Sequence, residues 1–339
     1  MEWNFNLIII FGVVLCCWCQ REPSVPLSSD SLRIILRGLF VKPAGRIPAV
    51  DDIIIRYYST NFSTPKSYKI VATKKLLANP DLDFKKPTVL YAHGYVEFAT
   101  DESVSVVVNS YLARGGHNVL LLDWSNLAFG DVLAVARNIQ AAGRTTGMAV
   151  LKLLRGGVAL DSIHFVGHSM GAHLLAAAAR NLKAKGYKIP RLTGLDPAYP
   201  GFYRFLVPTV AQPLSRADAI FVDTIHTDGG GFGTPVQVGH ADFWPNGGQA
   251  TQPGCISATI PLTTEDFCSH WRSWVFWAES VAGGEFRARL CRDHDGFLRG
   301  RCTGDLVDMG LRATPNLRGN YYLRTAAMPP YALGDRGGS

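Results

Sequence analysis

The sequence predicts an α/β fold: a mostly parallel, doubly wound sheet in a single domain. Two observations support this. Short continuous apolar runs alternate with longer amphipathic stretches, and a Gly-x-Ser-x-Gly motif joins one such run to a helical pattern. The runs that we expect to be buried strands are 88–92, 118–123, 162–167, 192–196 and 219–225. The helical patterns between them are 103–115, 132–154 and 172–185. No internal repeat and no linker to a second domain is visible.

The composition excludes several classes of protein. The chain has 339 residues, 47% hydrophobic and 18% charged, so it is long enough to bury a large core and is not a disordered chain. No long uncharged apolar run follows the N-terminus, which argues against several membrane spans. The formal net charge of +7 suits acidic surfaces or heparin-like polyanions, and arginines gather at 287–301. No nucleic-acid-binding motif is present, so nucleic acid is not an expected partner.

The N-terminus predicts secretion. Residues 7–15 form an apolar run that is too short to span a bilayer, and cleavage before Gln20 would define a signal peptide over residues 1–19. Residues 20–50 then form a loosely patterned N-terminal segment rich in Pro and Ser. An uncleaved membrane anchor is the alternative. We therefore expect a secreted, extracellular protein.

Cysteine usage agrees with secretion. Seven cysteines less the three at positions 16, 17 and 19 leaves four, an even number that indicates disulfide bonds in a secreted chain. Three connectivities are possible. We favour Cys255–Cys268 and Cys291–Cys302, because each pairing closes a short local loop. Asn61 begins an Asn-x-Ser sequon and is a candidate for glycosylation.

The Gly-x-Ser-x-Gly motif, GHSMG at 167–171, predicts a nucleophile. Between a strand and a helix, this motif forms a tight turn that raises the serine hydroxyl above the sheet. We therefore predict Ser169 as the nucleophile, with the Met170 N–H at the helix N-terminus as one oxyanion donor. A glycine turn also follows the predicted strand 88–92, and it makes the Tyr95 N–H the second candidate donor.

A serine nucleophile needs a base and an acid that orients the base. In the α/β-hydrolase order the acid follows the serine, and the histidine follows the acid. Asp196 ends the next predicted strand, so we favour it over Asp228, which follows the strand after that. Among the later histidines we favour His270, which lies near Cys268 in a helical run rich in tryptophan. His240 is its rival, and the histidines at 226 and 294 are expected to be structural or solvated.

Taken together, the motifs resemble the secreted pancreatic-lipase family of animals. The matching segments are YAHGY (91–95), LDW (122–124), GHSMGAH (167–173), GLDPAYP (194–200), HTDGG (226–230), GHADFWPNGG (239–248) and CSHWRS (268–273). The resemblance implies an α/β-hydrolase lipase domain over residues 51–320. It also places the family's catalytic residues on Ser169, Asp196 and His270, and its oxyanion donors on Tyr95 and Met170. Asp228 and His240 then become structural positions.

Two departures resemble the phospholipase A1 branch of the family, which includes insect enzymes. Only residues 256–267 lie between Cys255 and Cys268, the pair that bounds the lid in the family, and the loop after HTDGG is also short. A small cover leaves room for a bulky polar head group, whereas a long amphipathic lid supplies apolar surface for triglyceride.

The resemblance implies a serine carboxylester hydrolase that needs no cofactor. Its substrates would be fatty-acyl esters of glycerolipids at a membrane, micelle or lipid-droplet surface, cleaved through an acyl-enzyme. A neutral triacylglycerol lipase is the alternative. A non-catalytic, yolk-protein-like lipid-binding protein is the further alternative.

Two further family features are not expected. Triglyceride lipases of the family carry a C-terminal β-sandwich domain, for which we expect no counterpart here. Asp218 matches one calcium-binding carboxylate of the family, but Ser215 stands where another aspartate is expected, so we predict no metal site. The Gly- and Pro-rich sequence after Gly319 predicts a flexible tail over residues 321–339.

Overall fold

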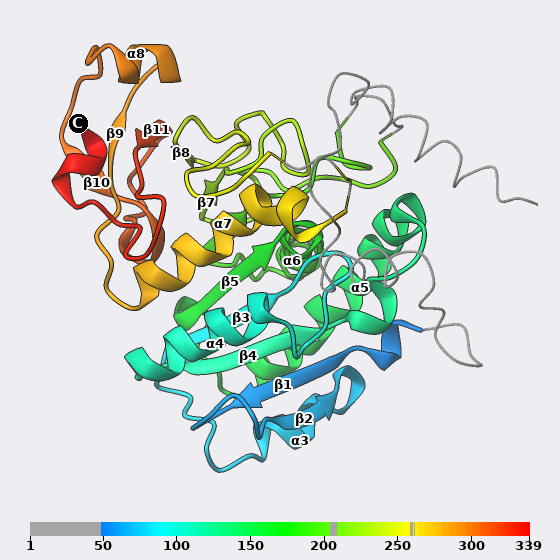
Figure 1. Cartoon of the computed structure of the whole chain (residues 1–339). Coiled ribbons are helices and arrows are strands. Elements are labelled where there is room, and N and C mark those ends of the chain that lie inside the picture. Colours follow the sequence, from blue (N-terminus) through cyan, green and yellow to red (C-terminus); the bar gives the residue numbers. More distant parts are fainter. Residues whose placement is uncertain (1–48, 204–208, 258–259, 261) are drawn as a thin grey trace, which may run out of the picture.

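The computed structural model describes residues 49–203, 209–257, 260 and 262–339 (Figure 1). Its strands are β1 (Ile54–Tyr58), β2 (Lys66–Lys69), β3 (Thr88–Ala92), β4 (Asn118–Asp123), β5 (Ile163–His168), β6 (Arg191–Leu195), β7 (Phe221–Ile225), β8 (Ala241–Pro245), β9 (Arg287–Leu290), β10 (Leu306–Asp308) and β11 (Gly319–Leu323). Its α-helices are α3 (Thr73–Leu77), α4 (Glu102–Arg114), α5 (Val132–Arg155), α6 (Met170–Lys183), α7 (Thr264–Val281) and α8 (His294–Leu298). Short 3-10 helices lie at Val50–Asp52, Ile70–Ala72, Ser125–Leu127, Leu160–Ser162, Gly310–Arg312 and Asp335–Gly338.

The strands of the described residues form one sheet in the order β10-β9-β11-β8-β7-β6-β5-β3-β4-β1-β2. Every neighbouring pair from β4 across to β11 is parallel. Antiparallel pairs complete both edges. The sheet is therefore mostly parallel, which confirms the predicted α/β-hydrolase fold class. Because parallel strands end at the same edge, the loops after β3, β5, β6 and β7 meet at one rim of the sheet.

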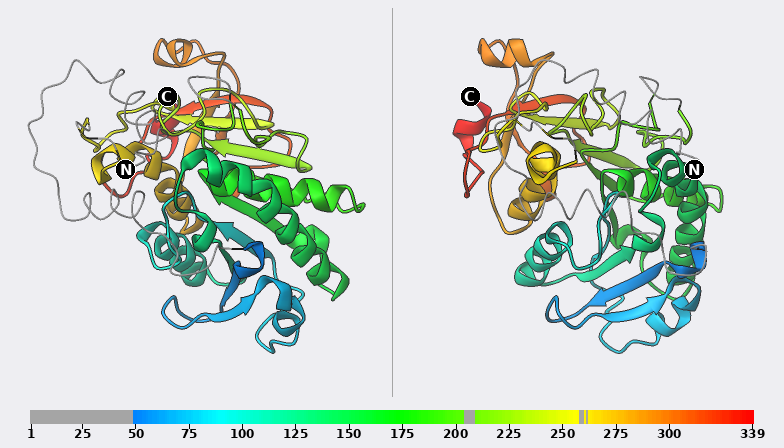
Figure 2. Two further views of the ribbon diagram at one scale, coloured as in Figure 1. Left: turned by 90° about the vertical axis from the view of Figure 1, so that its right-hand side faces the viewer. Right: turned by 45° about the vertical axis from the view of Figure 1, so that its right-hand side comes forward.

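Helices cover both faces of the sheet. Helices α5 and α6 lie side by side on one face, and α4 and α7 cover the other (Figure 1, Figure 2). Each pair of helices contributes to its own buried apolar cluster. The close approach of α5 to α6 requires glycine, since a Cβ at Gly143 would lie 2.4 Å from the Cβ of Ala177. Both faces of β3 and β4 are thus covered, which explains their continuous apolar runs.

The predicted elements at the centre of the sheet are confirmed to within two residues at each end. Their apolar runs are long enough to locate each strand, and the amphipathic stretches locate α4, α5 and α6. The predicted signal peptide at 1–19 and nearly all of the segment at 20–50 lie outside the described residues.

The structure corrects the prediction of a flexible tail over residues 321–339. Strand β11 spans the proposed boundary at 320 and lies between β8 and β9. Beyond it, the Arg324 N–H donates to Gly337 O at 2.7 Å, and Gly337 is itself buried. The domain boundary predicted at residue 320 therefore cuts through a strand.

Two disulfides join Cys255 to Cys268 and Cys291 to Cys302, the pairings favoured from the sequence. Their Cα–Cα distances of 5.7 and 4.7 Å are within the ordinary range for disulfides. The first disulfide ties the segment before α7 to the first turns of that helix. No helix in the described part of the chain is long and apolar enough to cross a bilayer.

Candidate active site

Ser169 lies at the turn between β5 and α6, on the rim where the parallel strands end. Its backbone has φ 53° and ψ −123°, a strained conformation for a residue with a Cβ. The glycines on either side allow the turn to be this sharp. A Cβ at Gly167 would lie 2.5 Å from Ala172 N, and one at Gly171 would lie 2.3 Å from Ala92 O. The strand, turn and helix are thus arranged as the motif predicts.

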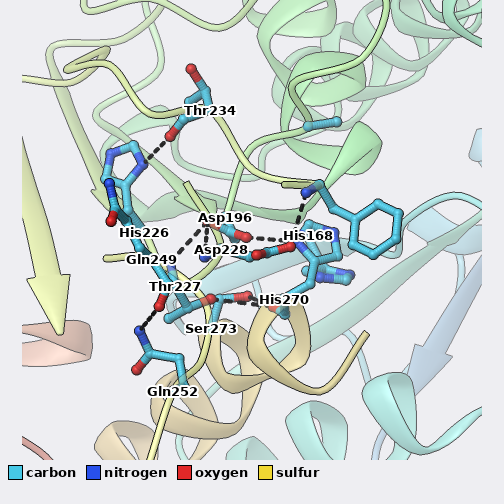
Figure 3. A network of polar contacts seen from close by, with 12 residues as sticks. His168, Asp196, His226, Thr227, Asp228, Thr234, Gln249, Gln252, His270 and Ser273 are labelled. Carbon is cyan, nitrogen blue, oxygen red and sulfur yellow. Dashed lines mark hydrogen bonds and ion pairs between the residues drawn. The ribbon is translucent and has the colours of Figure 1, made fainter. Parts of the chain in front are cut away.

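Asp196 and His270 form a buried pair near this turn (Figure 3). His270 Nδ1 lies 2.6 Å from Asp196 Oδ2, and the two residues are 2% and 0% exposed. Asp196 follows β6, and its other carboxylate oxygen accepts the N–H groups of Thr227 at 2.9 Å and Asp228 at 3.3 Å. These donors follow β7 and fix the carboxylate, while α7 carries the imidazole.

Two contacts bring Ser169 to this pair. The Ser169 N–H donates to the carbonyl of Leu195, the residue before Asp196, at 2.9 Å. The ring of His168, the residue before Ser169, lies 4.6 Å from the ring of His270. The three predicted catalytic residues therefore come together at one rim, from three different elements.

The loop after β3 lies against Ser169 as well. A Cβ at Gly94 would meet Ser169 Cβ at 3.0 Å. The Tyr95 N–H, the next amide in this loop, donates to no acceptor among the described residues. Met170 is the first residue of α6, where backbone N–H groups and the helix dipole favour negative charge. Both predicted oxyanion donors thus belong to segments that border Ser169.

Known proteins match this chain over most of its length. A family model described as Lipase matches residues 49–331. The chain belongs to the lipase family. It is 29% identical to pancreatic lipase-related protein 2 of Homo sapiens, covering 78% of this chain and 60% of that protein. It is 30% identical to phospholipase A1 member A of Homo sapiens, covering 74% of this chain and 54% of that protein. For pancreatic triacylglycerol lipase of Sus scrofa, the identity is 28% and the coverages are 78% and 62%.

The matches confirm the resemblance read from the sequence motifs. The chain spans between 54% and 62% of the length of these three relatives. The comparisons therefore establish the family of this chain.

The electrostatics of this lipase-family site favour a neutral imidazole. Burial lowers the pKa of His270, and the nearby His168 adds to this shift, while the hydrogen bond to Asp196 opposes it. The net pKa of His270 lies below its usual value, so the form that accepts a proton persists to lower pH. Burial and the charge of Asp196 raise the pKa of Asp228 well above its usual range, which favours its protonated form.

The rival residues have other partners. Asp228 Oδ2 accepts the N–H of Phe232 at 2.9 Å and makes no hydrogen bond to His270 within the described residues. His240 immediately precedes β8, at the edge opposite Ser169, and its Nδ1 accepts the Val222 N–H at 3.0 Å. This arrangement agrees with the choice of Asp196 and His270, although their catalytic roles stay predictions.

Two places in the structure could be considered as metal sites: a cluster of three side chains near Ser169, and the single carboxylate of Asp218. Donor atoms of Asp196, Asp228 and His270 lie within 4.8 Å of one another. His270 Nδ1 and Asp196 Oδ2 already contact each other at 2.6 Å, and Asp196 Oδ1 accepts the N–H groups of Thr227 and Asp228, so this set does not fit a cation. Asp218, the match to a calcium ligand of the family, pairs with Arg180 at 2.9 Å. The guanidinium of Arg180 already neutralises the charge of this carboxylate, so Asp218 does not fit a cation either.

Two residues that border the site were not predicted from the sequence. Glu97 is buried, and its Oε2 lies 3.3 Å from His168 Nδ1. The Phe232 ring lies 5.6 Å from the His270 ring and stacks on Phe267 at 4.5 Å. Neither residue belongs to a recognisable motif. Their contacts depend on which strands become neighbours, and spacing along the chain does not show this.

Proposed function

We propose that this protein is a serine carboxylester hydrolase that cleaves fatty-acyl esters of glycerolipids, with Ser169, His270 and Asp196 as its catalytic triad. The observation that supports it most is the buried 2.6 Å contact of His270 with Asp196, beside the strained turn that carries Ser169. Membership of the lipase family supports the same class of reaction.

In the proposed reaction, Ser169 Oγ attacks the ester carbonyl carbon while His270 Nε2 takes the hydroxyl proton. The N–H groups of Tyr95 and Met170 stabilise the oxyanion that forms. The ester C–O bond then breaks, His270 gives its proton to the leaving alcohol, and the acyl group stays on Ser169. Water repeats the attack, with His270 again as base, and releases the fatty acid. Asp196 orients the imidazole and stabilises its protonated form.

Within this class, we propose phospholipids as the preferred substrates. The segment between Cys255 and Cys268 is short, and α7 already begins at Thr264 within it. Little chain remains to form an amphipathic lid over the rim. A phospholipase A1 is among the relatives, which supports this choice. Triacylglycerol lipases are relatives too, so neutral lipid is the second candidate.

A lipid panel tests both levels of the proposal. Purified protein and its Ser169→Ala variant are assayed for fatty-acid release from phosphatidylcholine vesicles and from a triolein emulsion. We expect faster release from phosphatidylcholine, and a loss of at least about 10³-fold in the variant. A clear preference for triolein contradicts the phospholipid proposal alone. Absence of turnover, together with no fluorophosphonate adduct on Ser169, would instead favour the non-catalytic lipid-binding alternative.

We also propose that the protein is secreted. Two disulfides favour an oxidising compartment. Asn61 is exposed, as a glycosylation site requires, and we propose that it carries a glycan. A fall in mass on enzymatic deglycosylation, absent in Asn61→Gln, is the expected result. Recovery of the protein only inside the cells that express it would contradict secretion.

A polyanion is a further proposed partner, at a surface different from the predicted arginine cluster. Carboxylates balance most of the charge in that cluster: the pairs are Arg287–Asp308, Arg292–Asp293 and Arg299–Asp295. Three further exposed cations that make no salt bridge with a carboxylate among the described residues lie at the amino ends of β6, β7 and β11. They are Lys188, Arg216 and Arg318.

Backbone contacts make these cations neighbours. The Ile220 N–H donates to Ile189 O at 2.9 Å, and the Gly319 N–H donates to His240 O at 2.8 Å. Burial is the largest cause that lowers the pKa of His240, and the charges of Arg318, Arg216 and Lys188 lower it further. This edge of the sheet is opposite the rim of Ser169, so a polyanion held there would leave the catalytic rim free.

Heparin chromatography in rising salt tests this surface. We expect the variant Lys188→Ser/Arg216→Ser/Arg318→Ser to elute at lower salt than wild type. The matched control, Arg292→Ser/Arg299→Ser, is expected to elute with wild type. If the control variant instead elutes at lower salt than the triple variant, the arginine cluster binds the polyanion. If wild type is not retained on heparin, the proposal is wrong.

A further inference from the structure

One buried carboxylate joins the two segments that carry the proposed oxyanion donors, and the triad does not include it. Glu97 is 6% exposed and lies in the loop between β3 and α4. A single oxygen, Oε2, accepts the Gly94 N–H and lies 3.3 Å from His168 Nδ1. His168 is the last residue of β5 and directly precedes Ser169. Glu97 therefore connects the oxyanion loop to the nucleophile turn.

Other contacts of the loop complete the pattern. The carbonyl of His93 accepts from Trp124 Nε1 at 2.9 Å, so the His93–Gly94 peptide is held at both its C=O and its N–H. His93 Nδ1 lies 3.0 Å from Gly94 O, which holds the carbonyl of the next peptide. The N–H of that next peptide, on Tyr95, is the group left without an acceptor among the described residues.

We propose that Glu97 is a positioning residue for catalysis: by accepting the Gly94 N–H and the His168 Nδ1–H, it orients the Gly94–Tyr95 peptide so that the Tyr95 N–H faces the oxyanion. The proposal rests on the function proposed above. Without the acceptor, the Gly94 N–H would be a buried donor with no partner, and the peptide would turn to satisfy it. A donor that must reorient during the reaction stabilises an oxyanion less than a fixed one does.

The charge of Glu97 is consistent with this role. Burial alone would raise its pKa, but the charge and hydrogen bond of His168, the charge of His93 and the Gly94 N–H together lower the pKa to about 2. The carboxylate is thus ionised at neutral pH and is a strong acceptor for both donors. A bare negative charge near a developing oxyanion would oppose catalysis, so the pairing with His168 is part of the arrangement.

Three variants distinguish an acceptor from a charge. Glu97→Gln keeps an oxygen acceptor without the charge, Glu97→Asp keeps the charge on a shorter side chain, and Glu97→Ala removes both. We expect kcat to fall about 10²–10³-fold in Glu97→Ala, with KM little changed, and about tenfold or less in Glu97→Gln. The matched control is Glu102→Ala, an exposed carboxylate at the start of α4, which is expected to match wild type.

Inhibitor binding separates positioning from a structural effect. A boronic acid mimics the tetrahedral oxyanion, whereas a non-hydrolysable ether lipid mimics the bound substrate. In Glu97→Ala, we expect the boronic acid to bind about 10²–10³-fold more weakly and the ether lipid to bind as in wild type. Equal weakening of both ligands, or a wild-type kcat in Glu97→Ala, would overturn the proposal. So would an equal loss of kcat in Glu97→Gln and Glu97→Ala.

Two controls keep these outcomes interpretable. If Glu97→Ala does not fold, Glu97→Asp decides: its carboxylate is expected to lose reach to one donor and to lower kcat about tenfold or more. A folded Glu97→Asp with wild-type kcat would then overturn the proposal. Wild type and Ser169→Ala are assayed in parallel. An inactive wild type counts against the function proposed above, whereas an active wild type with active Glu97 variants counts only against Glu97.

Discussion

Replacing Asp196 by Asn removes the charge that faces His270 and keeps the size of the side chain. The Asn oxygen can still accept the Thr227 N–H, which donates to Asp196 Oδ1 at 2.9 Å. The Asn amide would then face His270 Nδ1, where the carboxylate oxygen now lies at 2.6 Å. An amide donor there places the imidazole proton on Nε2, the atom that must take the proton of Ser169.

The expected loss is large because no solvent replaces the lost partner. Asp196 is 0% exposed and His270 is 2% exposed. A wrong tautomer in a buried triad of this kind lowers kcat by about 10⁴-fold. At about 1.4 kcal/mol for each factor of ten, this loss corresponds to roughly 5.5 kcal/mol in the free energy of the transition state. KM is expected to change little, since neither side chain has a proposed role in binding lipid.

Asp228→Asn is the matched control, because Asp228 is the other buried carboxylate near His270. Burial and the charge of Asp196 raise the pKa of Asp228, so losing its charge is expected to cost little. An Asn oxygen can also keep the acceptor for the Phe232 N–H. Single-turnover release of p-nitrophenol from an ester substrate gives the rate of acylation for each variant. The reasoning fails if Asp196→Asn keeps a rate within about tenfold of wild type, or if Asp228→Asn loses as much.

Three further predictions follow from the same region. Because burial lowers the pKa of His270, the base stays neutral to lower pH, and the acidic limb of kcat/KM should have its midpoint below about 6.5; a midpoint above that value contradicts the assignment. A Cβ at Gly233 would lie 2.3 Å from Asp196 Oδ1, so Gly233→Ala should displace the carboxylate and lower kcat about 10²-fold. Unchanged kinetics in this variant would contradict the prediction and show that the loop moves to accommodate the methyl group. Removing the Cys255–Cys268 disulfide as a double alanine variant should lower the free energy of unfolding by about 3 kcal/mol in urea titrations, and an unchanged midpoint would refute this.

The centre of the fold was predictable because each central strand is buried on both faces. Strands β3, β4 and β5 consequently appear as continuous apolar runs whose ends are visible in the sequence. The nucleophile turn was predictable for a different reason: only glycine fits at 167 and 171, so the motif follows from steric exclusion. Both patterns lie within short stretches of sequence, so they can be recognised without knowledge of the tertiary structure.

What the sequence did not show depends on contacts between distant segments. In β11 the apolar residues Tyr321 and Leu323 lie among glycines and prolines, whose abundance suggested a tail. The strand forms because β8 and β9 supply partners on both sides. Glu97 was overlooked for a similar reason. An acidic residue in a turn is expected to be solvated, and its burial against His168 follows only from the pairing of β3 with β5.

The position of β11 has a consequence for biosynthesis. Within the sheet, β9 and β10 are joined to β8 through β11, although both are made earlier than β11 on the ribosome. Until residue 323 has emerged, the edge of β8 is an open strand that offers unpaired N–H and C=O groups to other chains. Nascent protein stalled or truncated before Gly319 is therefore expected to aggregate or to depend on chaperones, whereas completion of β11 seals that edge in a single step.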